Sequence, residues 1–246
     1  MSAQLADIKW HPITFQHYLV GPILADTKTQ TRRVMTKQPP AGTTFFGHEM
    51  PRDVWHPCNG DPRDVETWGG TGDAVRCPYG QSGDRLWVRE CWAFGENKPG
   101  MLGKFWEGGV PWTGGGPDVR AWRENVILYY KANNEPVLNT SWRSSRFMPR
   151  WASRLNVEIV DIRAQRLQDI TEDDAADEGI VLTPCTHPDC IASKKNGLKS
   201  RCAADSFRGA FAVGWDKING RRGYTWQSNP WVWCLSFRRI NACQPL

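Results

Sequence analysis

The sequence predicts an α+β fold in which a mixed β-barrel carries short flanking helices and long loop insertions. Short segments of alternating apolar and polar residues recur along the chain, whereas segments with helical periodicity are few. The 23 glycines and 17 prolines cluster between those segments, as is typical of long loops that join non-local strands. A chain of 246 residues is long enough for one large domain with insertions, and we expect a single domain over residues 1–246.

The N-terminal half predicts strands, one helix and two long insertions. Residues 17–26 have the apolar spacing of a short amphipathic helix, despite Gly21 and Pro22. Residues 36–82 and 95–122 are rich in Gly, Pro or Trp without a sustained period, which predicts loops. Strands are predicted at residues 11–16, 29–35, 85–93 and 126–132.

The C-terminal half predicts two helices between two strands. Thr171 has the sequence pattern of an N-cap for a helix over residues 172–178, which Gly179 ends. Residues 203–218 have helical spacing with a strong apolar face. Strands are predicted at residues 154–170 and 231–240, and a third insertion at residues 183–205.

Three segments in order resemble motifs of one known family. Residues 26–33 contain Lys28 and Arg33 at the positions of a Gly-x-Lys-x-x-Glu-x-Arg signature, although Asp26 and Thr31 replace its Gly and Glu. A Gly-Asp pair followed by a hydrophobic strand, and a closing Asn-Pro-Trp-Val-Trp strand, come later in the chain. These two segments are residues 83–90 and 229–233, accompanied by residues 148–152 and 167–170.

Together these segments resemble the ASCH domain family of the PUA-like superfamily, and in particular uncharacterised phage and prophage ASCH proteins. The resemblance implies a PUA-like mixed β-barrel and a basic cleft that binds RNA, DNA or a modified nucleoside. It also implies possible activity as an amidohydrolase of acylated cytidine, or as a ribonuclease. The amidohydrolase branch uses a Lys and a Thr three residues apart with a later Glu, which implies Lys28, Thr31 and Glu90 as catalytic residues.

The chemistry of these three residues is coherent, because a threonine hydroxyl needs a base and a lysine serves when desolvation lowers its pKa. At a helix end or turn, Lys28 and Thr31 would be neighbours. On a fully extended strand they would face opposite sides, which argues against the pair. The alternative is that Lys28 and Arg33 belong to a solvated basic edge.

Arginine and tryptophan dominate the candidate binding residues. The net charge is +5, and residues 141–168 carry six arginines against two acids. Arginine suits phosphate contacts and stacking on bases, and some of the 14 tryptophans could line a cleft. The alternative is a solvated face with ion pairs. The predicted nucleic-acid-binding residues are Arg33, Trp87, Arg89, Trp92, Arg146, Arg150 and Trp151.

The cysteines suggest one metal site. A basic loop that lacks an apolar period holds four potential zinc ligands, namely Cys185, His187, Cys190 and Cys202. The alternative is a loop with incidental thiols, because the spacing lacks two Cys-x-x-Cys knuckles. A second site at His56, Cys58 and Cys77 has weaker support. No nucleotide cofactor is expected, because Gly114-Gly115-Gly116 lacks the Lys of a phosphate-binding loop.

The sequence also bears on location and partners. It shows neither a signal peptide nor an apolar stretch long enough to cross a bilayer, so we expect a cytoplasmic protein of a bacterium or a phage-infected cell, without a membrane partner. An alternative function is that of a phage accessory protein that binds a host protein through Trp- and Arg-rich loops, without catalysis.

Overall fold

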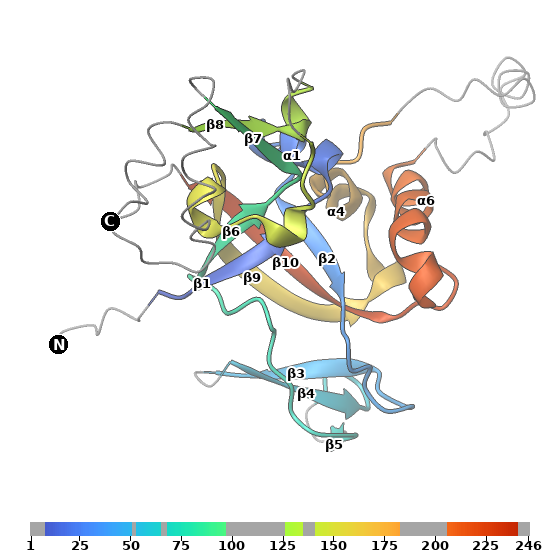
Figure 1. Cartoon of the computed structure of the whole chain (residues 1–246). Helices are drawn as coiled ribbons and strands as arrows, with labels where there is room; N and C mark the ends of the chain where they lie inside the picture. Colours follow the sequence, from blue (N-terminus) through green and yellow to red (C-terminus); the bar gives the residue numbers. More distant parts are fainter. Residues whose placement is uncertain are drawn as a thin grey trace, which may run out of the picture.

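The computed structural model describes residues 8–50, 53–64, 68–96, 126–134, 141–182 and 206–240. In this part of the chain the fold is α+β, with three sheets and few helices, as the sequence predicts (Figure 1). Most of the insertion at 95–122 and all of the insertion at 183–205 lie outside the described residues.

The main sheet has five strands in the order β1, β6, β9, β10, β2. Strands β1 and β6 pair in parallel, and the other neighbours are antiparallel. Within the described residues this order does not close into a ring of hydrogen bonds, so the closed barrel remains a prediction. The strands are β1 (Trp10–Thr14), β6 (Arg85–Arg89), β9 (Asn156–Arg166), β10 (Trp231–Ile240) and β2 (Gln30–Val34).

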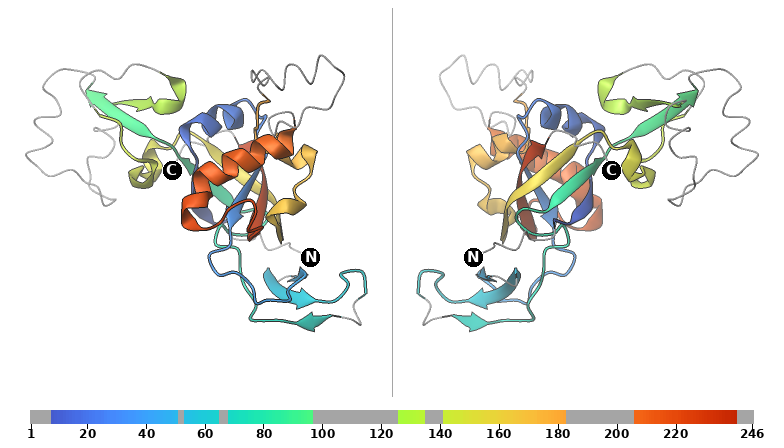
Figure 2. Two further views of the ribbon diagram at one scale, coloured as in Figure 1. Left: turned by 90° about the vertical axis from the view of Figure 1, so that its right-hand side faces the viewer. Right: turned by 90° about the vertical axis from the view of Figure 1, so that its left-hand side faces the viewer.

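The segment predicted as one strand over residues 85–93 is two strands. Strand β6 ends at Arg89, and β7 (Trp92–Glu96) pairs instead with β8 (Val126–Tyr130) in an antiparallel ribbon. This ribbon extends away from the main sheet (Figure 2). An interruption of two residues is too short to appear in an alternating pattern, which explains why the sequence predicted continuity.

Residues 36–82 are not loop alone. They contain β3 (Phe45–Glu49), β4 (Val54–Asn59) and β5 (Gly69–Gly70), which form a separate antiparallel sheet below the main one (Figure 1). These strands are short and contain glycine or proline, so their alternation is weak. The insertion packs on the main sheet, because the Phe46 and Trp231 rings lie 4.9 Å apart between centroids.

Helices α1 (His17–Leu24), α4 (Glu172–Asp177) and α6 (Phe207–Asn219) lie close to their predicted ranges. The Thr171 hydroxyl accepts a hydrogen bond from the backbone N–H of Asp174 at 3.0 Å, which confirms the predicted cap. Among the described residues, no helix is long and apolar enough to cross a membrane.

The two faces of the β9–β10–β2 region pack on different cores. Trp231 and Trp233 of β10 face the main core, whereas Val232 between them packs with Phe211 and Trp215 of α6. This follows from the alternation of side chains along a strand, and it covers both faces of the sheet at this point. The main core also holds Leu86 and Val88 of β6 and Val157 and Ile159 of β9.

A turn before β6 fixes the start of that strand. Asp84, which is 3% exposed, accepts hydrogen bonds from the backbone N–H groups of Lys9 and Gln81, both at 3.0 Å. Gly80 has a φ of +106°, and a Cβ there would lie 2.6 Å from the Asp84 Oδ2. The turn therefore depends on a glycine at position 80 for both conformation and space.

We expect Gly80→Ala to destabilise the protein more than Gly83→Ala. Gly83 has a similar φ of +91°, but a Cβ at that position would have nothing within 4 Å, so alanine there carries only the left-handed backbone cost of about 1–2 kcal/mol. Gly80→Ala adds overpacking of about 1–3 kcal/mol. Urea unfolding of both variants measures the difference, and equal losses would show that the close approach at position 80 does not matter.

Candidate nucleic-acid interface

The side chain of Lys28 is enclosed between β2 and α4. Its Nζ donates to the Glu178 carboxylate at 2.7 Å, to the Glu178 backbone carbonyl at 2.8 Å and to the Gln30 backbone carbonyl at 2.7 Å. The residue is 1% exposed. Burial lowers the pKa of Lys28, and the Glu178 carboxylate opposes that shift. An ammonium has three donors, and all three are used inside the protein.

Lys28 belongs to a larger buried network that joins β2 to α4. Arg32 donates to the Glu178 carboxylate at 3.3 Å and to the Asp174 carboxylate at 2.8 Å. It also donates to the Gln30 side-chain oxygen at 2.6 Å. The network therefore fixes the position of α4 on the sheet through charged hydrogen bonds that are buried or partly buried.

Acid is expected to weaken this network through Asp174. Burial raises the pKa of Asp174, but the hydrogen bond from Gln30 and the charges of Arg32 and Arg163 outweigh it and leave the pKa below 3.8. A carboxyl with a lowered pKa stabilises the fold at pH values above its unfolded value, and this contribution is lost as the pH falls through the folded value. Urea unfolding should therefore show stability falling as the pH drops below 3.8, and less steeply in Asp174→Asn. Identical pH profiles for the two proteins would contradict this.

Thr31 lies on the opposite face of β2 from the network. Gln30 and Arg32 point to α4, so Thr31 between them points to the main core, where its strand partner is Leu235. No hydrogen bond joins Thr31 to Lys28 in the described part of the chain. The backbone is thus extended at Thr31, the geometry that argues against a catalytic pair.

Glu90 lies beyond the end of β6 with a different partner. Its carboxylate accepts two hydrogen bonds from Arg154, at 2.9 Å from Nε and 3.0 Å from Nη2. Glu90 is 1% exposed, and the Arg154 guanidinium lies 4.0 Å from the ring centroid of Tyr130. Glu90 is thus paired with Arg154, whereas Lys28 is paired with Glu178. In the described part of the chain, hydrogen bonds do not join Lys28, Thr31 and Glu90 into one group.

The outer face of β1 and β6 carries a different arrangement. In this parallel pair Trp10 lies opposite Arg85, Pro12 opposite Trp87 and Thr14 opposite Arg89. The intervening Leu86 and Val88 are buried in the main core, so Arg85, Trp87 and Arg89 point outward, where each is partly exposed.

Arginines lie on both outward tryptophans. The guanidinium carbons of Arg85 and Arg150 are 5.4 and 4.3 Å from the Trp10 ring centroid. The guanidinium carbon of Arg89 is 4.8 Å from the Trp87 ring centroid. Arg89 also donates to the backbone carbonyl of Arg146 at 3.2 Å, which holds the segment around Arg146 beside β6. These cation–π contacts fix guanidinium groups that remain partly exposed to solvent.

We call this surface the arginine face, comprising Trp10, Arg85, Trp87, Arg89, Arg146 and Arg150. In the described part of the chain, no carboxylate oxygen lies within 4.0 Å of a side-chain nitrogen of its four arginines. Glu158, the neighbour of Arg85 on β9, is paired with Arg238 at 2.9 Å. The buried Nε atoms of Arg85 and Arg89 have no hydrogen-bond partner.

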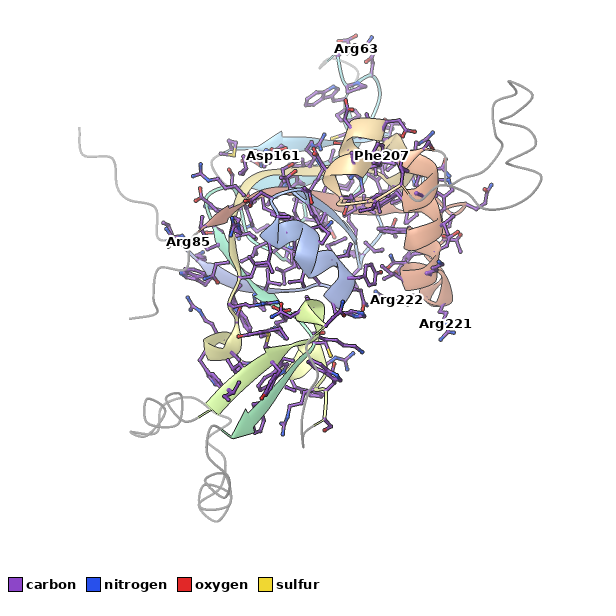
Figure 3. The ribbon with its side chains drawn as sticks, turned by 90° about the horizontal axis from the view of Figure 1, so that it is seen from above. Arg63, Arg85, Asp161, Phe207, Arg221 and Arg222 are labelled. Carbon is purple, nitrogen blue, oxygen red and sulfur yellow. The ribbon has the colours of Figure 1, made fainter. Side chains whose placement is uncertain are left out.

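Five arginines elsewhere in the described residues are paired with acids, whereas others, such as Arg33 and Arg166, donate to backbone carbonyls. Arg32, Arg154, Arg163, Arg238 and Arg239 all have carboxylate partners. Among the described residues, the arginine face therefore concentrates positive charge that no nearby carboxylate neutralises. Figure 3 labels Arg85 at one side of the molecule, across from Arg221 and Arg222 beyond the end of α6.

Three residues predicted to bind nucleic acid lie elsewhere. Trp92 is fully buried, and its ring contacts that of Trp151 edge-on at 6.1 Å. Arg33 donates to the backbone carbonyl of Thr14 at 2.6 Å, with its guanidinium carbon 4.9 Å from the Phe15 ring centroid. These three side chains are used largely for packing and for joining elements of the fold.

Two members of the arginine face were not predicted from the sequence. Trp10 lies one position before the strand predicted at residues 11–16, and Arg85 is the first residue of the strand predicted at residues 85–93. The alternation Arg85-x-Trp87-x-Arg89 was a usable signal for an outward basic row. The parallel pairing that brings Trp10 to Arg85 has no local signal in the sequence.

The metal predictions have no structural support. Cys185, His187, Cys190 and Cys202 lie outside the described residues. Within the described ranges, no group of three or more His, Cys, Asp or Glu side chains is placed to hold a metal ion, which includes the suggested set of His56, Cys58 and Cys77. His56 is instead 3.0 Å from the Glu49 carboxylate, and burial raises the pKa of Cys77 to about 12.

Comparisons with protein family models, with curated proteins and with solved structures gave no match to this chain. Its function is therefore inferred from the geometry of the described residues.

Proposed function

We propose that this protein binds single-stranded nucleic acid, RNA or DNA, on the arginine face. The observation that carries the proposal is a group of four arginines with no acidic partner among the described residues. Two of them lie on β6 and two on the adjacent turns, beside two tryptophans on the outer side of β1 and β6. Phosphates would supply the missing negative charge, because arginine matches phosphate geometry and releases counterions on binding. Bases would stack on the exposed aromatic and guanidinium surfaces.

We propose further that the main sheet is the curled wall of a PUA-like barrel of the ASCH type. The hydrogen bond from Arg33 to the Thr14 carbonyl, at 2.6 Å, joins the two edge strands β2 and β1. The ring of Phe15, which follows β1, lies 6.1 Å between centroids from the ring of Phe237 on β10, the neighbour of β2. Contact between opposite edges is what a sheet curled towards closure requires. A family with this fold and with members linked to RNA binding fits the proposed ligand.

The binding experiment uses the purified chain and fluorescently labelled oligonucleotides at low salt. We expect saturable changes in anisotropy with short single-stranded RNA and DNA, and weaker binding to a perfect duplex of the same length. Absence of binding to all single-stranded probes would overturn the proposal. Equal affinity for single strand and duplex would show phosphate contacts without base stacking.

Amide hydrolysis of acylated cytidine is the second candidate. One observation favours it, namely that burial lowers the pKa of Lys28, as a lysine base requires. The use of all three Lys28 donors by Glu178 and Gln30 weighs against it. Turnover of acetylated cytidine by the wild type, together with its loss in Thr31→Val, would establish this activity. Turnover that Thr31→Val leaves unchanged would remove Thr31 from the site.

Binding of a host protein through aromatic loops has less support. In the insertion at 36–82, Phe46 and Trp55 pack on Trp231 and Trp233 of the main sheet, at centroid distances of 4.9 and 5.8 Å. Aromatic side chains that contribute to the core are not free to contact a partner.

A further inference from the structure

Phe147 is a large apolar side chain left in water beside the arginine face. It is 68% exposed, although its neighbour Met148 is 3% exposed. Burying a phenylalanine stabilises a fold, and single exposed apolar residues are nonetheless common on proteins. Exposure alone therefore carries no conclusion, and the surroundings of Phe147 decide its meaning.

The turn that carries Phe147 is firmly held. Phe147 ends a short 3₁₀ helix, Ser145–Phe147, and its backbone N–H donates to the Ser144 carbonyl at 3.0 Å. Met148 fills the core on the C-terminal side, where its sulfur accepts a hydrogen bond from the Glu90 backbone N–H at 3.3 Å. The exposed Phe147 ring therefore projects from a backbone that is held by the hydrogen bond to Ser144 on one side and by the buried Met148 on the other.

The same turn is part of the arginine face. Arg146 precedes Phe147 directly, and its carbonyl accepts the hydrogen bond from Arg89. Arg150, three residues after Phe147, lies on Trp10. This segment combines an exposed aromatic ring with two arginines that have no acidic partner among the described residues. That is the composition of a single-strand binding site, in which cations follow the backbone and aromatic rings stack on bases.

We propose that Phe147 stacks on an unpaired base and thereby makes the arginine face selective for single strands over duplexes. This inference rests on the proposed function. In a duplex the bases are already stacked on one another and their faces are covered, so Phe147 would have no partner. In a single strand every base has a free face, which makes the contact available in any sequence.

The test compares three probes of equal length, namely an oligothymidylate, the same backbone with abasic residues, and a duplex. Phe147→Ala should weaken binding to the oligothymidylate by about 5- to 150-fold and should change binding to the abasic probe little. Phe147→Trp should retain affinity, whereas Phe147→Leu, which keeps the apolar character, should lose much of it. The matched control is Val213→Ala on α6, where Val213 is 46% exposed, and it should bind like the wild type.

The outcomes separate this inference from the proposed function. If Phe147→Ala binds the oligothymidylate as the wild type does, the stacking role is overturned, while the wild-type binding still upholds the arginine face. Equal loss on the oligothymidylate and the abasic probe would also overturn it, because stacking requires a base. No binding of any probe by the wild type would remove the proposed function and this inference together.

Discussion

Glu178→Ala is expected to be the most destabilising single change in the buried network. The substitution leaves the Lys28 ammonium with only two backbone carbonyl acceptors and removes one acceptor of Arg32. Breaking a buried ion pair by removing one partner costs about 3–5 kcal/mol, because the remaining charge stays buried without compensation. Urea unfolding at neutral pH measures the loss directly.

Two comparisons make this prediction specific. Lys28→Met should cost less, because methionine has a similar length and Glu178 keeps its bond from Arg32. Arg239→Ala breaks the pair between Arg239 and Asp26, which has a similar N–O distance of 2.8 Å but is exposed, and should change stability little. If Glu178→Ala were no more destabilising than Arg239→Ala, the network would not stabilise the position of α4.

Neutralising the arginine face should remove most nucleic-acid affinity and most of its dependence on salt. Each phosphate contact with a single strand contributes about 0.7 to the slope of log affinity against log salt, so four contacts give a slope of about −2.8. Alanine at Arg85, Arg89, Arg146 and Arg150 together should lower affinity on the order of 100-fold or more at low salt. Single variants should each reduce the slope by about 0.7.

The control for net charge lies on the other side of the molecule. Arg221 and Arg222, which are exposed after α6, can be replaced together by alanine without touching the arginine face (Figure 3). This double variant should keep the wild-type affinity and slope, apart from a small long-range effect. Anisotropy titrations from roughly 50 to 200 mM salt give both quantities. Similar losses in an arginine-face pair and in this pair would show that binding follows overall charge instead of a site.

Most element positions could be predicted because they depend on local features. Alternation or strand-favouring residues located β1, β2, β8, β9 and β10 to within a few residues, and the Thr171 cap located the start of α4. The strands within 36–82 were missed, since β3 to β5 are short and interrupted, and their pairing with each other stabilises them more than intrinsic preference does.

The candidate site could be predicted only in part, for a related reason. The predicted binding residues Trp87, Arg89, Arg146 and Arg150 lie around one surface, and their binding of nucleic acid stays a prediction, whereas Trp92 was grouped with them and is buried. Whether an aromatic residue faces solvent depends on the strand to which it belongs. Trp87 lies on β6, whereas Trp92 lies on β7, because the strand is interrupted between them, and the Trp92 side chain is buried there.

The sequence by itself determined the α+β class, the order of the elements and the abundance of arginine near residues 141–168, because periodicity, capping and composition are properties of neighbouring residues. Only the tertiary structure decided which charges are neutralised. It paired Lys28 with Glu178, which lies 150 positions further along the chain. It also placed Arg85 and Arg150 beside Trp10, where no described carboxylate pairs with them. Pairing between distant residues is set by strand order and helix packing, and these depend on the burial of the whole apolar surface at once.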